Sequence, residues 1–487
     1  MEKIKKFLFQ NTEKKQTVMK NTFWLFTSEA TGRLLKMGLI IYAARVLGVN
    51  GWGIFSYSVS VGALLMIMSD FGIGDLIMRE ATQKKENYKT FISTALVLKI
   101  ILVVLSILVV IFVGPIISHV PEARAIFPIV SLILLFDSLR ELGLAINRVS
   151  EKMERDMIVK TITNTVIFGL GVLLLKAHSD PSSIAIAYAV GSAVGFFTIS
   201  IIIWKDLKKL LSKIDTRMFM VVFQITWPFA IIALIGVIMG NVDIYMLGVW
   251  RDSGEIGLYS AVQRIQQFVM IIPSTMAVAV FPLLAKLANV DKVQFRSVLE
   301  KIISLIMIVC IPITVGGVLL ANKIVPFIFG QDYMGAVPIL QVLMLMLLVS
   351  APLVILSNVI FAYNKQKELV VAYSSGIFAN VLLNLLLVPK FGAVGSAVAT
   401  LISTSIIVIY IWNKIKKINY FEIKNKLYKS IIATIVMIFV ILLLQKLGVN
   451  LIINISISAL TYMCSLLILK ESTFREIRAV LAEKKPL

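Results

Sequence analysis

Three charged side chains lie close together within the first long apolar stretch of the sequence. Glu29, Arg33 and Lys36 occur in "TSEATGRLLK", between the apolar segments "NTFWLF" and "MGLIIYAA". Their spacing of i, i+4 and i+7 predicts that all three project from one face of a helix. A carboxylate beside two cations can form ion pairs, and two cations on one face can bind an anion through charge-assisted hydrogen bonds.

A second charged group, Asp137, Arg140 and Glu141, has the spacing i, i+3 and i+4, which also predicts a shared helix face. This group either locks two helices together through ion pairs or lines a polar cavity. Charges that face lipid cost about 3 kcal/mol each, so we expect them to face a partner or water. Single polar residues interrupt other apolar stretches: Asp70, Lys99, Asp243, Arg264 and Gln267.

Two of these residues have an alternative interpretation. Lys99 can reach the membrane surface by extending its long side chain, as lysines near helix ends do. Asp243 lies near the end of its apolar stretch and can equally belong to the outer membrane interface.

The composition indicates that membrane-spanning helices position these residues. Of the 487 residues, 59% are hydrophobic and 15% are charged, and the mean hydropathy is +0.92. Soluble proteins contain about 45–50% apolar and about 25% charged residues. Apolar runs of about twenty residues recur along the whole chain, which is typical of transmembrane helices. The sequence therefore predicts an all-α polytopic membrane protein.

Fourteen transmembrane helices are predicted, with both termini on the same side of the membrane because the number is even. Of the 48 lysines and arginines, 36 lie in the termini and loops on that side or at the adjoining span ends. Only 7 lie in or next to the loops on the other side, and 5 lie deeper within spans. The predicted spans are 20–45, 52–78, 91–113, 126–147, 157–175, 183–204, 218–249, 255–285, 297–321, 335–362, 369–388, 394–413, 430–445 and 451–469.

This bias predicts that both termini are cytoplasmic, in a multi-pass protein of the cell (plasma) membrane, because lysine and arginine concentrate in cytoplasmic loops. The net charge of +21 then faces anionic lipid. Nucleic acid is therefore not expected as a partner, although the chain is strongly basic.

The sequence repeats itself at an offset of 204 residues. "GIFSYS" at 53–58 resembles "GLYSAV" at 257–262, and "GSAV" at 191–194 recurs at 395–398. Both matches fall in corresponding spans of two six-span halves, which therefore enter the membrane in the same sense. Parallel repeats of this kind are related by a pseudo-two-fold axis along the membrane normal.

We therefore predict two pseudo-symmetric six-helix lobes followed by a C-terminal helix pair. The N-lobe, with spans 1–6, covers residues 1–205, and the C-lobe, with spans 7–12, covers 218–413. The extra pair, spans 13 and 14, covers 429–470 and has few polar residues in mid-span.

No catalytic, cofactor or metal site is predicted. The sequence lacks a glycine-rich phosphate loop ending in Gly-Lys-Ser/Thr, and its predicted loops are too short for a separate enzyme domain. The two histidines, His119 and His178, lie far apart, so no metal-ligand spacing exists. Cys310 and Cys464 both lie in apolar runs and indicate core residues.

The intramembrane charges instead predict a central cavity that favours anions. Arg33 and Lys36, with Arg264 and Gln267 from the C-lobe, are predicted to bind a diphosphate or an acidic sugar. A cation exporter would need a cavity dominated by carboxylates. The residues predicted to balance charge or to couple transport to an ion gradient or membrane potential are Glu29, Asp70, Asp137, Arg140, Glu141 and Asp243.

Two segments carry a resemblance to a known family. "YAARVLGVNGWGIFS" at 42–56 resembles the junction between the first two spans of polysaccharide and oligosaccharide-lipid flippases, and the resemblance continues through "SDFGIGDLIMRE" at 69–80. These flippases belong to a superfamily that also contains the multidrug and toxin extruders. The fourteen predicted spans extend the resemblance over the full chain, whereas the drug extruders usually have twelve.

The resemblance implies a V-shaped pair of lobes that alternates between inward-open and outward-open states. It implies a polyprenyl-diphosphate-linked glycan as substrate, which is moved from the cytoplasmic to the outer leaflet for cell-surface polysaccharide biosynthesis. Related lipid II flippases have an essential arginine in span 1, in a setting that Ser28 and Arg33 resemble. They also bind the lipid tail in a groove beside spans 13 and 14.

Besides the glycan and membrane lipid, a glycan polymerase or glycosyltransferases are candidate partners. The main alternative function is a cation-coupled multidrug exporter of the same superfamily. An integral-membrane glycosyltransferase or polymerase is a third alternative, but it would need large outer loops with acidic catalytic pairs and would leave the 204-residue repeat unexplained.

Overall fold

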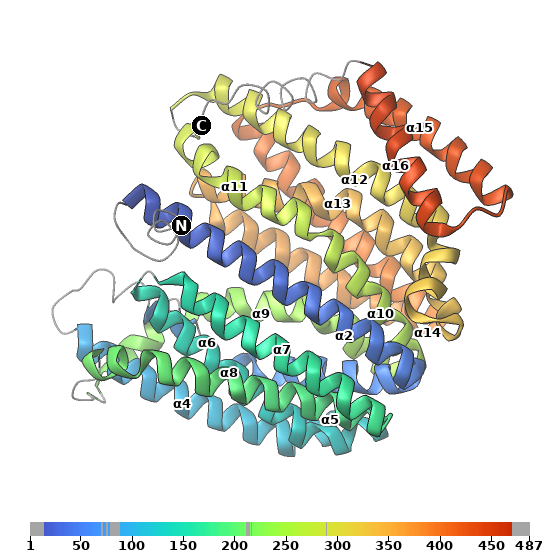
Figure 1. Ribbon diagram of the computed structural model, residues 1–487. Coiled ribbons are helices and arrows are strands. Elements are labelled where there is room, and N and C mark those ends of the chain that lie inside the picture. Colours follow the sequence, from blue (N-terminus) through green and yellow to red (C-terminus); the bar gives the residue numbers. More distant parts are fainter. Residues whose placement is uncertain are drawn as a thin grey trace, which may run out of the picture. The chain divides into compact units, whose positions relative to one another are not determined.

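The computed structural model describes residues 14–69, 72–74, 76–77, 88–150, 152–210, 215, 217–288 and 290–469. Within these ranges every regular element is a helix, which confirms the predicted all-α class. Contacts divide the chain into two compact units, Met1–Ser260 and Ala261–Leu487 (Figure 1).

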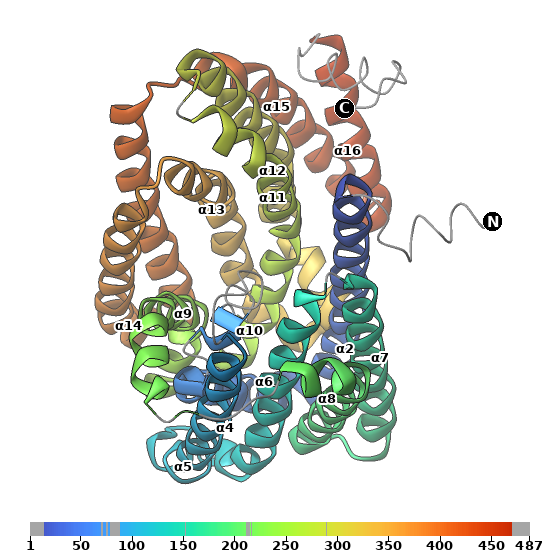
Figure 2. The same cartoon turned by 90° about the vertical axis from the view of Figure 1, so that its left-hand side faces the viewer.

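The first unit is built around its N-terminal helix, α2. This helix packs against α6, α7, α8 and α9, and α8 in turn packs against α6 and α7 (Figure 2). The elements of this unit are α2 (Lys14–Leu65), η1 (Met66–Ser69), α4 (Tyr88–Phe112), α5 (Gly114–Ile117), η2 (Pro121–Ile126), α6 (Phe127–Val149), α7 (Met153–Ala177), α8 (Pro181–Leu210), α9 (Met218–Trp250) and the start of α10 (Ser253–Val269).

The second unit is centred on α13, which packs against α11, α12 and α14. The last two helices, α15 and α16, pack against each other and against α12. The elements that follow α10 are α11 (Ile271–Leu287), α12 (Lys292–Phe329), η3 (Gln331–Ala336), α13 (Val337–Ala362), α14 (Gln366–Ile418), α15 (Lys424–Lys446) and α16 (Leu451–Ile468).

In the described part of the chain, eleven helices are long and apolar enough to cross a membrane, fewer than the fourteen predicted spans. The chain is thus a polytopic membrane protein. Two of the long helices, α2 and α14, each overlap two predicted spans. The α6 helix overlaps the predicted span 126–147 but does not qualify by composition, because it contains Asp137, Arg140, Glu141 and Arg148.

Each of these two long helices is broken at a single glycine that lies between the two predicted spans. Gly48 in α2 has φ 65° and ψ −176°, and Gly392 in α14 has φ 56° and ψ −138°. Glycine adopts positive φ without the steric cost that a side chain brings. The chain can therefore turn at a single residue, and both turns lie within the short junctions, 46–51 and 389–393, that separate the predicted spans.

A repeated turn precedes one helix in each unit. A six-residue 3-10 turn, η2, leads into α6, and a turn of the same length, η3, leads into α13. Both helices have a proline at their second position, Pro128 and Pro338, where the missing N–H removes no helix hydrogen bond. This correspondence adds a third element to the two sequence matches that predicted the repeat.

Ion pairs connect α2, α6, α7 and α8 within the first unit. Lys20 is fully buried and lies 3.0 Å from Glu154. The fully buried carboxylate of Asp156 accepts hydrogen bonds from Asn147 Nδ2 at 2.6 Å and from Arg148 Nε at 2.8 Å. Arg155 contacts Asp206 at 3.1 Å, and this pair is partly exposed.

We expect Asp156→Ala to destabilise the protein by about 2 kcal/mol, because it removes charge-assisted hydrogen bonds from a buried position. The cost stays below that of a fully buried ion pair since the Arg148 side chain is 27% exposed and can reach water. Asp206→Ala is the matched control, and its exposed pair predicts a loss below about 1 kcal/mol. Thermal unfolding of the purified variants tests this difference, and equal losses would contradict it.

Candidate functional site

The charged stripe on α2 faces α7. Arg33 Nε donates to Glu29 Oε1 at 2.8 Å, and Lys160 Nζ on α7 lies 3.6 Å from Glu29 Oε2. Gly32 permits this approach, because a Cβ there would lie 2.7 Å from Asn164 Nδ2. One carboxylate on α2 is therefore shared between an arginine of its own helix and a lysine of a neighbouring helix.

A small cavity of about 140 Å³ lies at this contact. It brings together the three charged residues of α2, two charged residues of α6 and three residues of α7. Its lining residues are Ser28, Glu29, Gly32, Arg33, Lys36, Arg140, Glu141, Lys160, Thr163 and Asn164. The predicted shared face of Glu29, Arg33 and Lys36 is thus the wall of a polar cavity in the structure.

The charged group on α6 is organised around Arg140. Its Nη1 lies 2.7 Å from Asp137 Oδ1, and its Nη2 lies 3.4 Å from Glu141 Oε1. The Arg140 side chain is only 12% exposed, whereas those of Asp137 and Glu141 are 40% and 49% exposed. Gly195 of α8 makes room for it, since a Cβ there would lie 2.9 Å from Arg140 Cδ.

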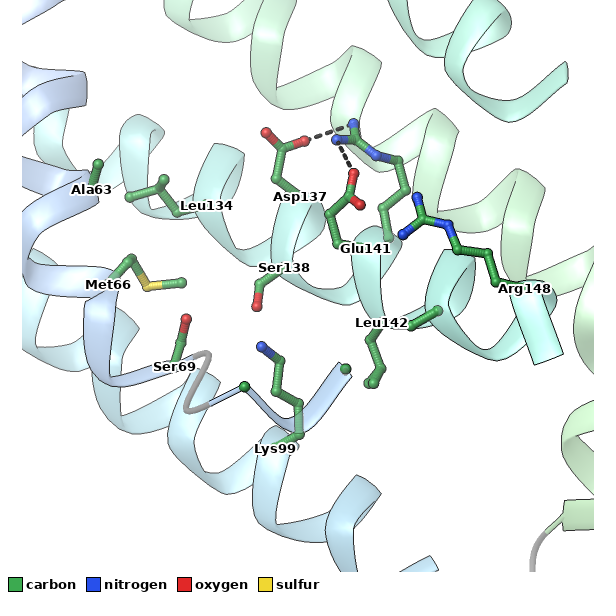
Figure 3. A pocket seen from close by; sticks show the side chains of 14 residues that line it. Ala63, Met66, Ser69, Lys99, Leu134, Asp137, Ser138, Glu141, Leu142 and Arg148 are labelled. Carbon is green, nitrogen blue, oxygen red and sulfur yellow. Dashed lines mark hydrogen bonds and ion pairs between the residues drawn. The ribbon is translucent and has the colours of Figure 1, made fainter. Parts of the chain in front are cut away.

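A larger cavity of about 510 Å³ adjoins this group, and Arg140 and Glu141 line both cavities. Figure 3 shows that Ser138 of α6 and Lys99 of α4 point toward each other across it. Its lining residues are Ala63, Met66, Ser69, Gly72, Gly74, Lys99, Leu134, Asp137, Ser138, Arg140, Glu141, Leu142, Ala145 and Arg148.

Positive charge exceeds negative charge in the lining of these two cavities. The basic residues are Arg33, Lys36, Lys99, Arg140, Arg148 and Lys160, and the acidic residues are Glu29, Asp137 and Glu141. All three carboxylates lie within 4.0 Å of an arginine or lysine nitrogen, so they compensate part of the basic charge. Clefts lined by an excess of one sign of charge concentrate ligands of the opposite sign. The two cavities are therefore suited to an anionic ligand.

The other predicted site residues are placed elsewhere. Arg264 and Gln267 belong to the second unit, where Arg264 Nη1 donates to Gln267 Oε1 at 3.0 Å. Asp243 is buried in the first unit and accepts a hydrogen bond from the Tyr259 hydroxyl at 2.8 Å. Asp70 lies outside the described residues.

Lys160 and Arg148 were not predicted as site residues, although both line the cavities. The sequence contains a signal for each of them. Lys160 and Asn164 are spaced i, i+4, and Arg148 lies seven residues after Glu141, so each continues a polar helix face. Arg148 lies just beyond the predicted span 126–147, and Lys160 lies near the start of the predicted span 157–175, so both count among the basic residues of the lysine-rich side.

The second unit contains an apolar cavity of about 570 Å³ beside the last two helices. Its lining comes from α10, α12, α13, α15 and α16 and includes Val309, Ile313, Leu320, Met344, Met437 and Ile455. Polar contacts hold this pair to α12: the Tyr462 hydroxyl donates to the Ile308 carbonyl at 2.7 Å, and Gln445 Nε2 donates to the Leu319 carbonyl at 2.9 Å. An aliphatic chain is the ligand that such a lining favours.

Charged side chains inside membrane-spanning helices mark substrate or ion pathways, so the charged cavities of this polytopic chain indicate a membrane transport protein. Residues 18–288 match the model of a family described as "Polysaccharide biosynthesis protein", which covers more than half of the chain. The chain therefore belongs to this family, a family of membrane transporters and flippases rather than enzymes.

Two curated proteins are similar to the chain over most of its length. The probable low-salt glycan biosynthesis flippase Agl15 of Haloferax volcanii is 23% identical, over 78% of this chain and 80% of that protein. A putative O-antigen transporter of Shigella flexneri is 21% identical, over 79% of this chain and 94% of that protein. The chain is thus distantly homologous to lipid-linked glycan flippases and O-antigen transporters.

Among solved structures, the lipid II flippase MurJ in an inward closed conformation is similar, with a TM-score of 0.78 and 20% identity. The match covers 94% of this chain and 99% of that chain. At this level of identity the likeness shows a shared fold.

Proposed function

We propose that the protein is a flippase that moves a polyprenyl-diphosphate-linked oligosaccharide from the cytoplasmic to the outer leaflet for polysaccharide biosynthesis. The observation that carries this proposal is the excess of arginine and lysine in the two cavities of the first unit. A diphosphate carries negative charge and several acceptor oxygens, which arginine and lysine bind through charge-assisted hydrogen bonds. The two relatives, a probable glycan biosynthesis flippase and a putative O-antigen transporter, support the same substrate class.

In this mechanism the two ends of the substrate meet different surfaces. Arg33, Lys36 and Lys160 bind the diphosphate, and the larger cavity beside Arg140 accommodates the first sugars. The polyprenyl chain stays in lipid or enters the apolar cavity beside α15 and α16. Arg33 and Lys160 are paired with the Glu29 carboxylate. A phosphate oxygen is an anionic acceptor like a carboxylate oxygen, so the diphosphate replaces Glu29 as their partner.

The proposal includes the architecture that the sequence predicts. Fourteen spans form an N-lobe (1–205), a C-lobe (218–413) and a helix pair (429–470), with both termini in the cytoplasm. The lobes alternate between inward-open and outward-open states around the head group, as parallel-repeat transporters do. In the C-lobe, Arg264 and Gln267 are the residues that we propose to bind the substrate.

Arg33→Ala and Arg264→Ala test the proposal in a cellular glycan-export assay. We expect each variant to lose export by about tenfold, because each removes one charge-assisted hydrogen bond to the anion. Arg45→Ala is the matched control for Arg33: it lies on the same helix, is exposed and lines neither cavity. Full export by both cavity variants, at normal membrane levels, would contradict an anion-binding role.

Efflux of cationic dyes separates the flippase from a cation-coupled multidrug exporter of the same superfamily. A cavity with more basic than acidic side chains disfavours cations, so we expect no efflux above that of cells without the protein. Efflux that depends on Glu29 or Asp137 would favour the exporter.

A further inference from the structure

The second unit contains another cavity, of about 780 Å³. The proposed mechanism uses it neither for the head group nor for the polyprenyl chain of the substrate. It lies between α12, α13 and the C-terminal half of α14, and residues 420–423 of the link to α15 close one end. It shares no lining residue with the apolar cavity beside α15 and α16. Its walls and its mouth differ in chemistry.

The walls are apolar over a depth that corresponds to one leaflet of a bilayer. They include Ile303 and Met307 of α12, Val349 and Pro352 of α13, and Val408 of α14. The lining of α14 runs from Ser405 to Lys416, which is about 16 Å along a helix axis. The hydrocarbon core of a bilayer is about 30 Å thick, so this depth matches about half of it.

The mouth of the cavity combines a lysine with aromatic rings. Lys416 Nζ lies 5.9 Å from the centre of the Trp412 ring and 5.4 Å from that of Tyr420. The guanidinium of Arg296 also lies over the Tyr420 ring, at 5.3 Å. Tryptophan and tyrosine concentrate at the level of lipid head groups, so the mouth has the composition of a membrane interface.

The link that forms the mouth is fastened to α12. Asn419 Nδ2 donates to the Lys292 carbonyl at 2.9 Å, and the backbone N–H of Glu422 donates to Glu300 Oε1 at 2.9 Å. Phe421 is fully buried, with its ring centre 4.7 Å from that of Trp412. These contacts hold the mouth of the cavity in place, so it is formed before a ligand binds.

The carboxylates near the mouth already have partners. Glu300 accepts from Arg296 Nε at 2.8 Å, and Glu422 accepts from the Tyr420 hydroxyl. The hydrogen bond to Glu422 raises the pKa of Tyr420, so the hydroxyl keeps its proton. The segment 413–429 contains six lysines and one carboxylate, so positive charge dominates around the mouth.

The cavity is open along the outer face of α14. Ile409 lines the cavity and is 60% exposed, and the neighbouring residues Ile402 and Ile406 on the same helix are exposed as well. In a membrane such apolar residues face lipid. An acyl chain can therefore enter from the side while its head group stays at the mouth.

We propose that an anionic glycerophospholipid binds here, with one acyl chain in the cavity and its phosphate at Lys416. The lipid comes from the leaflet on the lysine-rich side of the membrane, because basic pockets between transmembrane helices at that level bind anionic head groups. The site uses no residue of the transport cavities, so it stands apart from the proposed function.

Native mass spectrometry of the full-length protein in detergent tests the site, with dioleoylphosphatidylglycerol and dioleoylphosphatidylcholine as probes. We expect tighter binding of phosphatidylglycerol, and Lys416→Ala is expected to weaken that binding about fivefold while phosphatidylcholine binding stays unchanged. Lys417→Ala is the matched control, because Lys417 is the next residue of the same helix, is exposed and does not line the cavity.

A second variant tests the acyl-chain part of the site. Val408→Trp fills the cavity and is expected to weaken binding of both lipids, and the melting temperature of the variant reports whether it is folded. Equal losses in Lys416→Ala and Lys417→Ala would overturn the proposal, because they would indicate general attraction to a basic surface. Competition by inorganic phosphate as strong as that by the lipid would also overturn it, since the acyl chain would then contribute nothing.

Discussion

Arg140→Ala is expected to lower glycan export by about two orders of magnitude, more than any other single cavity substitution. Arg140 and Glu141 are the two residues that line both polar cavities, so the guanidinium can reach a head group in either one. A charge-assisted hydrogen bond contributes about 1.5–3 kcal/mol. A loss near 3 kcal/mol corresponds to about a hundredfold.

Removing Arg140 also changes the charge that the substrate meets. Asp137 and Glu141 lose the guanidinium that lies 2.7 Å and 3.4 Å from their oxygens. Their side chains are 40% and 49% exposed, so their negative charge would then face the cavity. Like charges repel, and an anionic head group would meet carboxylates where it met an arginine.

The initial rate of export at matched membrane levels measures this effect. Arg140→Lys keeps a positive charge and is expected to retain more activity than the alanine variant, although it loses the bidentate geometry of the guanidinium. Adding Asp137→Asn to Arg140→Ala removes one uncompensated carboxylate and is expected to restore part of the loss. An unchanged export rate in Arg140→Ala, with a melting temperature equal to that of the wild type, would show that the group has no part in transport.

The sequence alone predicts the helical membrane class because burial in lipid imposes long apolar runs and a charge difference between the two sides. It also separates the helices where the chain turns at a single glycine, because Gly48 and Gly392 lie in the junctions 46–51 and 389–393 between predicted spans. Arg45 and Lys390 lie near these turns and supply a polar signal in the sequence. The charges of α6 have a different origin, since they belong to a cavity wall.

For the candidate site, the sequence predicts which residues share a face of one helix, but not which helices pack together. The i, i+4, i+7 spacing identifies the face of α2 that carries Glu29, Arg33 and Lys36, but spacing within a helix does not reveal which helix packs on it. The contact between Glu29 and Lys160 of α7 therefore needed the structure. In the same way, the partner of Asp243 is Tyr259, sixteen residues further along the chain and on the next helix.

Two glycines that correspond in the internal repeat lie at one close helix crossing in the first unit. Gly53 of α2 and Gly257 of α10, which are related by the 204-residue offset, face each other there. A Cβ at Gly53 would overlap the Ser253 carbonyl and lie 2.9 Å from the Gly257 nitrogen. A Cβ at Gly257 would overlap the Val49 carbonyl and lie 3.2 Å from the Gly53 nitrogen. The reciprocal contacts are those expected where a pseudo-two-fold axis relates two helices.

Gly257→Ala is expected to destabilise the protein by about 3 kcal/mol or more. The added methyl group would meet backbone atoms, which cannot move aside as a flexible side chain does, so the two helices must separate. Gly240→Ala in α9 is the matched control, because nothing lies within 4 Å of its Cβ position. Alanine is a better helix former than glycine by about 1 kcal/mol, so the control is expected to be neutral or slightly stabilising.

Gly53→Ala extends this prediction to the repeat itself. If the crossing is pseudo-symmetric, the two alanine variants lose similar stability, and the double variant loses less than their sum because both methyl groups force apart the same pair of helices. Melting temperatures and the amount of folded protein in membranes measure all four variants. A neutral Gly257→Ala, or losses that add fully, would indicate that the two glycines do not share one close crossing.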